Sequence, residues 1–224
     1  MAETSDTAET PSIASRLPTE LWLLVFERDD VLTYRDLKRL SRVDKRFHEI
    51  EKSHSLDDAL FRSPPPAKPV EKGDPVRFHP VLNEASLVCT GVEDAHVYIR
   101  GKKDDDDSSP FVSVGDFPCV NEFATSPACK VVAVAMGGKP VARNASGVTV
   151  LDVVKASAAM WKSKPDTDHL LSISDWLLEG DPELDMREVT WRDTLGDHCF
   201  WEGMDKARCV KTGVVVLTPQ WFGS

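Results

Sequence analysis

The sequence predicts an α+β protein in two parts: an N-terminal three-helix unit, and a C-terminal domain with a small, mainly antiparallel sheet and one or two packed helices. Three observations carry this prediction. Up to residue 62, apolar residues recur every three or four positions, as on one face of a helix. Six prolines then fall between residues 63 and 80. Beyond them, short apolar runs bounded by turn residues are typical of strands.

Composition excludes several classes of function. A chain of 224 residues suits one domain or two small ones. Its formal net charge of −10 argues against general nucleic-acid binding, which depends on Lys and Arg neutralising phosphates. No apolar run reaches membrane-spanning length, and residues 1–15 contain no signal-peptide core, so no membrane is expected. Scattered cysteines without a close pair indicate reduced thiols in the cytoplasm or nucleus: Cys89, Cys119, Cys129, Cys199 and Cys209.

The first predicted helix follows a tail, residues 1–15, whose composition is typical of disorder. It opens the helical unit, 16–62, at Pro18, where a proline loses nothing because its missing N–H would be unpaired anyway. The apolar residues Leu17, Leu21, Leu24 and Val25 form one stripe at helical spacing. Trp22, Leu23 and Phe26 make the helix apolar almost all round, so it needs cover on a second side.

The rest of the helical unit repeats this pattern. Thr33 and Asp36 are spaced as a capping box, and apolar residues continue at helical spacing to Ile50. Ser55 is expected to cap a last short turn over residues 56–61. Basic residues between the apolar positions, including Lys38 and Arg39, are expected on a solvated face. A unit this small buries little surface alone, so a partner chain is expected.

Together these positions resemble a known family. The order Leu17-Pro18-x-Glu20-Leu21, then Val25-Phe26, then Asp36-Leu37-x-x-Leu40-x-x-Val43-x-x-x-Phe47 resembles the F-box. This three-helix motif docks substrate receptors on the Skp adaptor of cullin-based SCF ubiquitin ligases. The resemblance covers about a fifth of the chain. In one departure, residues 27–30 lengthen the connection after the Val-Phe pair, and Leu32 is expected to take the place of the family's leucine.

The resemblance implies a substrate-recognition subunit that binds a Skp-type adaptor and, through it, a cullin scaffold, and presents an unidentified target protein for ubiquitination. It implies no catalytic, metal or cofactor site, since transfer chemistry belongs to other subunits, and the chain is therefore not expected to be an enzyme. The alternative is a small ligand-binding or enzymatic α+β domain with a helical appendage. An uncovered apolar patch would favour the first interpretation. The expected adaptor-binding residues are Leu17, Pro18, Leu21, Val25, Leu37, Leu40, Val43 and Phe47.

A proline-rich linker over residues 63–80 is expected to be extended and semi-rigid. The domain expected to recognise the substrate, 81–224, then begins with a short helix over 82–88 and a strand over 95–99. Residues 101–110 contain four adjacent aspartates and are expected to form a solvated acidic loop. A calcium site would need spaced aspartates with a glycine turn, and that pattern is absent.

The remaining elements are expected in the following order. Residues 130–136 and 140–143 form a hairpin around Gly137-Gly138, which is a turn and not a phosphate loop because no Gly-Lys-Ser/Thr follows. Thr149 and Asp152 cap an amphipathic helix that runs to Trp161. A short helix over 172–178 comes next, and strands are expected over 189–191, 198–201 and 213–218, the last of them central because it is apolar throughout.

Residues 121–217 resemble a C-terminal domain of unknown function that is common in fungal proteins, which implies a fold but no chemistry. The resemblance rests on the hairpin of residues 128–141, on the run 147–154 and on Leu195-Gly196-Asp197-His198-Cys199-Phe200-Trp201-Glu202-Gly203-Met204. The adjacent His198 and Cys199 would point to opposite faces of a strand and so make a poor nucleophile pair. With Cys209 they lack the compact spacing of zinc ligands. Four tryptophans are expected in the core: Trp161, Trp176, Trp191 and Trp201.

Overall fold

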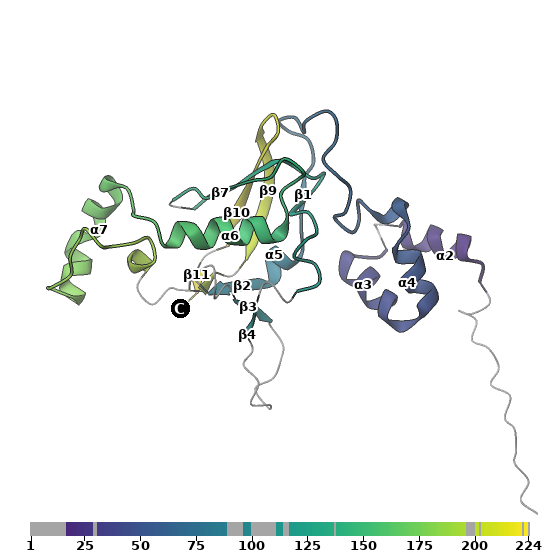
Figure 1. The fold of residues 1–224 in the computed structure, drawn as a ribbon, viewed down its shortest axis with the longest axis horizontal. Helices are drawn as coiled ribbons and strands as arrows, with labels where there is room; N and C mark the ends of the chain where they lie inside the picture. Colours follow the sequence, from purple (N-terminus) through teal and green to yellow (C-terminus); the bar gives the residue numbers. More distant parts are fainter. Residues whose placement is uncertain are drawn as a thin grey trace, which may run out of the picture. The chain divides into compact units, whose positions relative to one another are not determined.

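The chain forms two compact units. The structure, a computed structural model, describes residues 17–28, 31–88, 96–99, 111–113, 117–136, 138–195, 200–201, 203–220 and 222–223. Contacts divide the chain into Met1–Leu60 and Phe61–Ser224, and each unit has its own hydrophobic core. The first unit is helical and the second combines helices with sheets, so the α+β prediction is confirmed (Figure 1). The expected tail, 1–15, and the expected acidic loop, 101–110, lie outside the described residues.

The helical unit contains α2 (Thr19–Phe26), α3 (Tyr34–Val43), α4 (Lys45–Glu51) and a 3₁₀ turn, η1 (His54–Leu56). The predicted capping box of α3 is confirmed, with the Asp36 carboxylate accepting the Thr33 N–H at 3.0 Å. The helical pattern expected to continue to Ile50 is broken at Asp44, whose backbone is extended. Its carboxylate accepts the Arg46 N–H at 2.7 Å and so caps a new helix.

Large apolar side chains from all three helices fill the core of the helical unit. The rings of Trp22 and Phe47 meet edge to face with centroids 4.9 Å apart, and Phe26 lies against both. Leu32, which follows the lengthened connection, also packs on this core. The fully or nearly fully buried residues are Phe26, Leu37, Phe47, Ile50, Leu56 and Leu60.

The proline-rich segment is packed against the second unit, whereas the sequence predicts an extended, semi-rigid spacer between the units over residues 63–80. Val70 is buried in the core of that unit, and its carbonyl accepts the Gly213 N–H at 2.8 Å. The strand β1 (Arg77–Phe78) then pairs antiparallel with β5 (Thr125–Ser126). Apolar residues between the prolines anchor the segment, since an extended proline-rich chain can still run along a domain edge. The boundary between the units therefore lies at Leu60.

A four-stranded sheet forms the centre of the second unit, in the order β7-β6-β10-β9. The predicted hairpin is confirmed: β6 (Val131–Val134) pairs antiparallel with β7 (Val141–Arg143). The strand β10 (Val214–Pro219) is central, as predicted; it runs parallel to β6 and antiparallel to β9 (Met204–Lys211). Every other described strand pair is antiparallel, which agrees with the expected mainly antiparallel sheet.

The helix α6 (Val150–Trp161) lies along the four-stranded sheet, as predicted (Figure 1). Its capping box is present, with the Asp152 carboxylate accepting the Thr149 N–H at 3.0 Å. Apolar residues three and four positions apart cover β6 and β7, and their burial holds the helix on the sheet. The residues buried on this face are Val150, Val153, Val154, Ser157, Met160 and Trp161.

A second sheet has five strands in the order β11-β8-β2-β3-β4, all antiparallel. The helix expected over residues 82–88 is wrong in its second half: α5 (Val81–Glu84) ends early, and β2 (Ala85–Val88) is a strand because it pairs with both β3 and β8. The strand predicted over 95–99 is confirmed as β3 (His96–Ile99). The other three strands are β4 (Phe111–Ser113), β8 (Phe200–Trp201) and β11 (Phe222–Gly223).

The helix α7 (Thr167–Gly180) lies beyond the end of α6 and is longer than predicted (Figure 1). It begins early because the Asp166 carboxylate accepts the His169 N–H at 2.8 Å. The strand expected over residues 189–191 is wrong, since these residues make no ladder bonds and lead through turns to η4 (Asp193–Leu195). None of the helices in the described parts is long and apolar enough to span a bilayer.

Candidate partner-binding surface

The inner side of α2 positions the helix in its unit. Trp22 and Phe26 point into the core and pack on Phe47 of α4. These positions are four residues apart, so they lie one above the other on the same side of the helix. The inner side is therefore fully used by the unit's own core.

The outer side of α2 exposes large apolar side chains. Leu21 is 46%, Leu24 60% and Val25 40% exposed. They lie at positions i, i+3 and i+4, so they form one stripe. Burying such side chains is worth more than leaving them in water, which favours a partner that covers them. Within the described residues of the unit, the outer side of α2 therefore lacks the cover that its apolar side chains predict.

The eight residues expected to bind an adaptor do not lie on one surface. Leu37 is 1% exposed and Phe47 9%, so both belong to the core of the helical unit. The expectation that they form part of an exposed patch is therefore wrong. Leu40 is partly buried against the same core. Leu17 is partly exposed, and the exposed members are Pro18, Leu21, Val25 and Val43. Leu24 is not among the eight residues, although it belongs to the same apolar stripe in the sequence and is exposed.

A basic side chain of α4 fixes the start of α2. The Arg46 guanidinium donates to the Leu17 carbonyl and to the Thr19 hydroxyl, the latter at 3.3 Å. Pro18 is the N-cap and has no side-chain acceptor to offer. Arg46 thus holds the chain where it enters the helix, and this orients the outer stripe of α2.

Charged residues join α3 to α4. The Lys38 ammonium lies 2.7 Å from the carboxylate of Glu51, which is nearly buried, and also lies over the Tyr34 ring. Lys38 is therefore part of a helix–helix contact, which corrects its expected place on a solvated face. At the start of α3, hydrogen bonds from the Thr33 side chain and backbone hold the pKa of Asp36 below its usual value.

The described part of the chain does not support either the nucleophile pair or the zinc site considered in the sequence. Cys209 is buried in the core, where its thiol lies near the carbonyl of Val70. Burial raises the pKa of the Cys129 thiol, which disfavours the reactive thiolate. His198 and Cys199 lie outside the described residues. Within the described ranges, no group of three or more His, Cys, Asp or Glu could hold a metal ion.

His79 is a buried polar residue that the sequence did not single out. The Val81 N–H donates to Nδ1 at 3.2 Å, so Nε2 carries the proton and faces the Glu122 carboxylate at 3.0 Å. The Phe61 ring packs on the imidazole. Both ring nitrogens of His79 are thus hydrogen-bonded, and the side chain joins the end of β1 to the loop before β5. Its role is therefore structural.

Three of the four tryptophans expected in the core have described side chains. Trp161 and Trp191 are buried, as expected. Trp176, on α7, is 52% exposed, so the expectation that it lies in the core is wrong. Nothing is described of the Trp201 side chain.

No known protein family, curated protein or solved structure matches this chain.

Proposed function

We propose that this chain is an F-box-type substrate-recognition subunit that docks on a Skp-type adaptor of a cullin-based SCF ubiquitin ligase. The helical unit is the docking part, and the second unit presents a target protein. In such a ligase, the ubiquitin-transfer chemistry belongs to other subunits. The chain itself needs no cofactor for this role.

The apolar stripe of Leu21, Leu24 and Val25 is the observation that carries the proposal. It lies on a helix whose other side is already packed, within a unit of three short helices. The stripe follows the Leu17-Pro18 start that defines the resemblance to the F-box. A helix that is apolar on two sides is stable when both sides are covered.

Energetics indicate how the stripe would act. Fully burying a Leu or Val side chain contributes roughly 1.5–3 kcal/mol relative to leaving it exposed. Association costs several kcal/mol or more in lost freedom of motion. Several side chains of α2 must therefore be buried together, and removing two of them should have a large effect.

The test is a titration of a purified Skp-type adaptor onto the full chain by calorimetry. The double change Leu21→Ala and Leu24→Ala should remove roughly 2–4 kcal/mol of binding free energy, or about thirtyfold or more in affinity. Both side chains are substantially exposed, so the fold should remain intact. Circular dichroism checks that it does.

Leu171→Ala is the matched control. This leucine is 70% exposed on α7, outside the helical unit, so its removal should change adaptor binding by less than about 0.5 kcal/mol. Lys38 would be a poor control because it pairs with Glu51. Failure of the wild-type chain to bind the adaptor, or equal binding by the Leu21/Leu24 variant, would contradict the proposal.

A further inference from the structure

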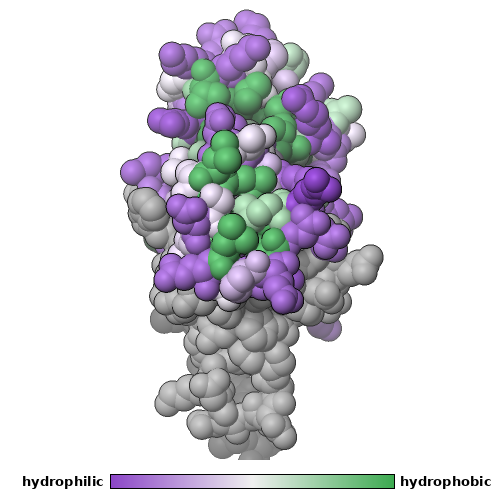
Figure 2. Space-filling view, turned by 90° about the vertical axis from the view of Figure 1, so that its left-hand side faces the viewer, coloured by the Kyte–Doolittle hydropathy of each residue, from purple (hydrophilic) through white to green (hydrophobic). Residues whose placement is uncertain are grey.

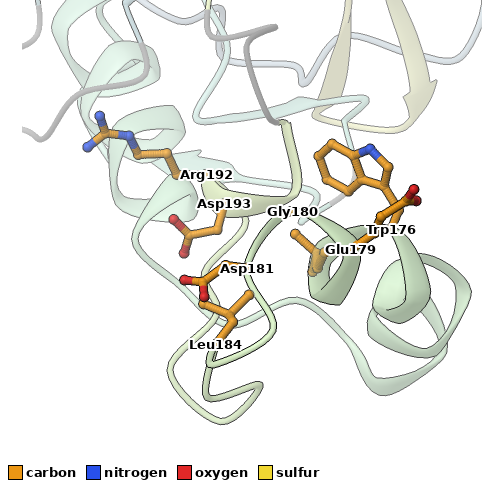
Figure 3. A pocket seen from close by; sticks show the side chains of 8 residues that line it. Trp176, Glu179, Gly180, Asp181, Leu184, Arg192 and Asp193 are labelled. Carbon is orange, nitrogen blue, oxygen red and sulfur yellow. The ribbon is translucent and has the colours of Figure 1, made fainter.

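A hollow of about 590 Å³ lies between α7 and the segment that follows it. Figure 3 shows the Trp176 indole on one side, with the carboxylates of Asp181 and Asp193 on the opposite side. Leu184 lies at its lower edge in this view. Glu179 also lines the hollow, and its carboxylate lies on the same side as the Trp176 indole. The hollow thus has an aromatic wall that also carries one carboxylate, facing an acidic wall, and it is separate from the surface on α2.

Turns fix the acidic wall in place. The Asp193 carboxylate accepts from both the N–H and the hydroxyl of Thr190, at 2.8 and 2.7 Å. The Asp181 carboxylate accepts the Glu183 N–H at 3.1 Å. Arg192 also lines the hollow, but in Figure 3 its side chain extends away from the two carboxylates. These bonds set the direction of each carboxylate before any ligand arrives.

The segment that carries Asp193 is itself tied to the end of α6. The Trp191 N–H donates to the Ser163 carbonyl at 2.9 Å, and the Arg192 N–H to the Trp161 carbonyl at 3.1 Å. The His169 ring of α7 packs on Trp191 with centroids 4.5 Å apart. Both walls therefore rest on one anchored frame, and the hollow is largely pre-formed, as binding sites usually are.

We propose that this hollow binds a basic segment of a partner protein. An arginine or lysine of that segment lies with its stem on Trp176 and its cationic head at Asp181 and Asp193.

Charge and shape favour this occupant. Residues 166–193 contain nine acidic and two basic side chains, so a cationic segment is attracted and an acidic one repelled. A cation over an indole face gains further stabilisation, and a guanidinium also stacks on it. A long basic side chain matches both walls because its stem is apolar and its head is charged. Figure 2, which views the side at which α7 lies in Figure 1, shows apolar patches between hydrophilic side chains.

The inference stands apart from adaptor docking, because it concerns the second unit and is tested without any ligase component. In a substrate receptor, the same hollow would select targets by their basic segments.

The experiment uses the full chain and a fluorescein-labelled synthetic peptide of alternating arginine and leucine, followed by fluorescence anisotropy. A second peptide carries glutamine in place of every arginine. We expect the arginine peptide to bind and the glutamine peptide to bind at least about tenfold more weakly. Added salt should weaken the binding of the arginine peptide, since exposed charges are screened.

Trp176→Ala is the decisive variant. The chain is acidic as a whole, so a basic peptide is attracted without any specific site. Trp176→Ala keeps every charge, and its side chain is half exposed, so it isolates the hollow with little risk to the fold. We expect about tenfold weaker peptide binding by this variant. Asp181→Asn, which preserves the shape of the side chain, should weaken binding several-fold.

Reciprocal controls separate this proposal from the previous one. Leu24→Ala should leave peptide binding unchanged, and Trp176→Ala should leave adaptor binding unchanged. Any one of three results overturns the inference. The wild type does not bind the arginine peptide, Trp176→Ala binds it as tightly as the wild type does, or the glutamine peptide binds as tightly as the arginine peptide. A fourth result also overturns the inference: the wild type self-associates in ultracentrifugation, Trp176→Ala does not, and the peptide does not bind. The hollow would then be a contact with a second copy of the chain.

Discussion

Gly203 lies immediately before β9 with a φ of +100°, which side chains other than glycine rarely adopt. A Cβ atom at this position would overlap the backbone carbonyl of Asn83, in α5. The Gly203 carbonyl also accepts the Gln220 N–H at 2.8 Å. This single residue therefore allows α5 to approach β9 closely.

Gly203→Ala should lower the free energy of unfolding by roughly 3–5 kcal/mol. The new Cβ would strain the backbone of residue 203, and it would also clash with backbone atoms of Asn83, which cannot move aside as a flexible side chain could. Urea denaturation followed by near-ultraviolet circular dichroism measures the loss. Gly73→Ala is the matched control: its φ is +97°, but a Cβ there meets nothing within 4 Å. It should cost about 1 kcal/mol. Equal costs at the two sites would show that the approach of α5 is not tight.

Among the elements, α6 depends on its capping box. The Asp152 carboxylate accepts the Thr149 N–H at 3.0 Å and the Asn144 side-chain amide at 2.8 Å. Burial acts to raise the pKa of Asp152, but these hydrogen bonds outweigh it and hold the pKa below its usual value. The carboxylate therefore binds fewer protons in the folded chain than in the unfolded one. Its contribution to stability is present above the unfolded pKa and is lost as the pH falls through the folded one.

Asp152→Ala should cost about 1 kcal/mol of unfolding free energy at neutral pH. The difference from wild type should shrink as the pH falls below about 4, because the carboxylate is then protonated in the unfolded chain and, at lower pH, in the folded chain as well. Urea denaturation over a pH series measures this trend. Asp168→Ala, in the first turn of α7, should cost much less, since Asp166 is the residue that caps that helix. A difference that stays constant with pH would contradict the assigned role of the charge.

Elements whose signals are local could be predicted from the sequence. Both capping boxes are present as expected, because their partners lie three residues apart. The hairpin of β6 and β7 is likewise encoded in two neighbouring runs. Prediction failed where distant partners decide, as at Ala85–Val88, which becomes a strand between β3 and β8. Trp191 reads as part of a strand in sequence, but in the fold it bonds to the end of α6.

The candidate surface was predicted only in part. Spacing correctly identified α2 as apolar on two sides, but it could not say which side faces the unit's own core. Leu37 and Phe47 match the family pattern and were assigned to an interface, yet they are buried within the unit. The sequence does not predict the hollow beside α7. Its two walls lie well apart in sequence, and the turns of residues 181–193 bring them together only in the folded chain.

For the whole molecule, the boundary at Leu60 has a consequence for dissection. Val70 and His79 are buried in the second unit, and β1 pairs with β5 there. A fragment of residues 61–224 should therefore fold with its own cooperative transition, whereas residues 81–224 should lose that transition, because the fragment lacks part of its core. Thermal unfolding of both fragments by circular dichroism tests this. Cooperative unfolding of the 81–224 fragment at the same temperature would show that the proline-rich segment contributes nothing to the fold.

The central place of β10 has a consequence for synthesis on the ribosome. The helical unit is complete once its first sixty or so residues have emerged, and domains generally fold in the order of their synthesis. The sheet of the second unit cannot close then, because its middle strand, Val214–Pro219, follows every other strand of that sheet. Until it arrives, the β6–β7 hairpin has an unpaired edge. A premature stop codon before Val214 would remove the middle of the sheet. The product would keep the helical unit but would expose an open sheet edge to chaperones and proteases.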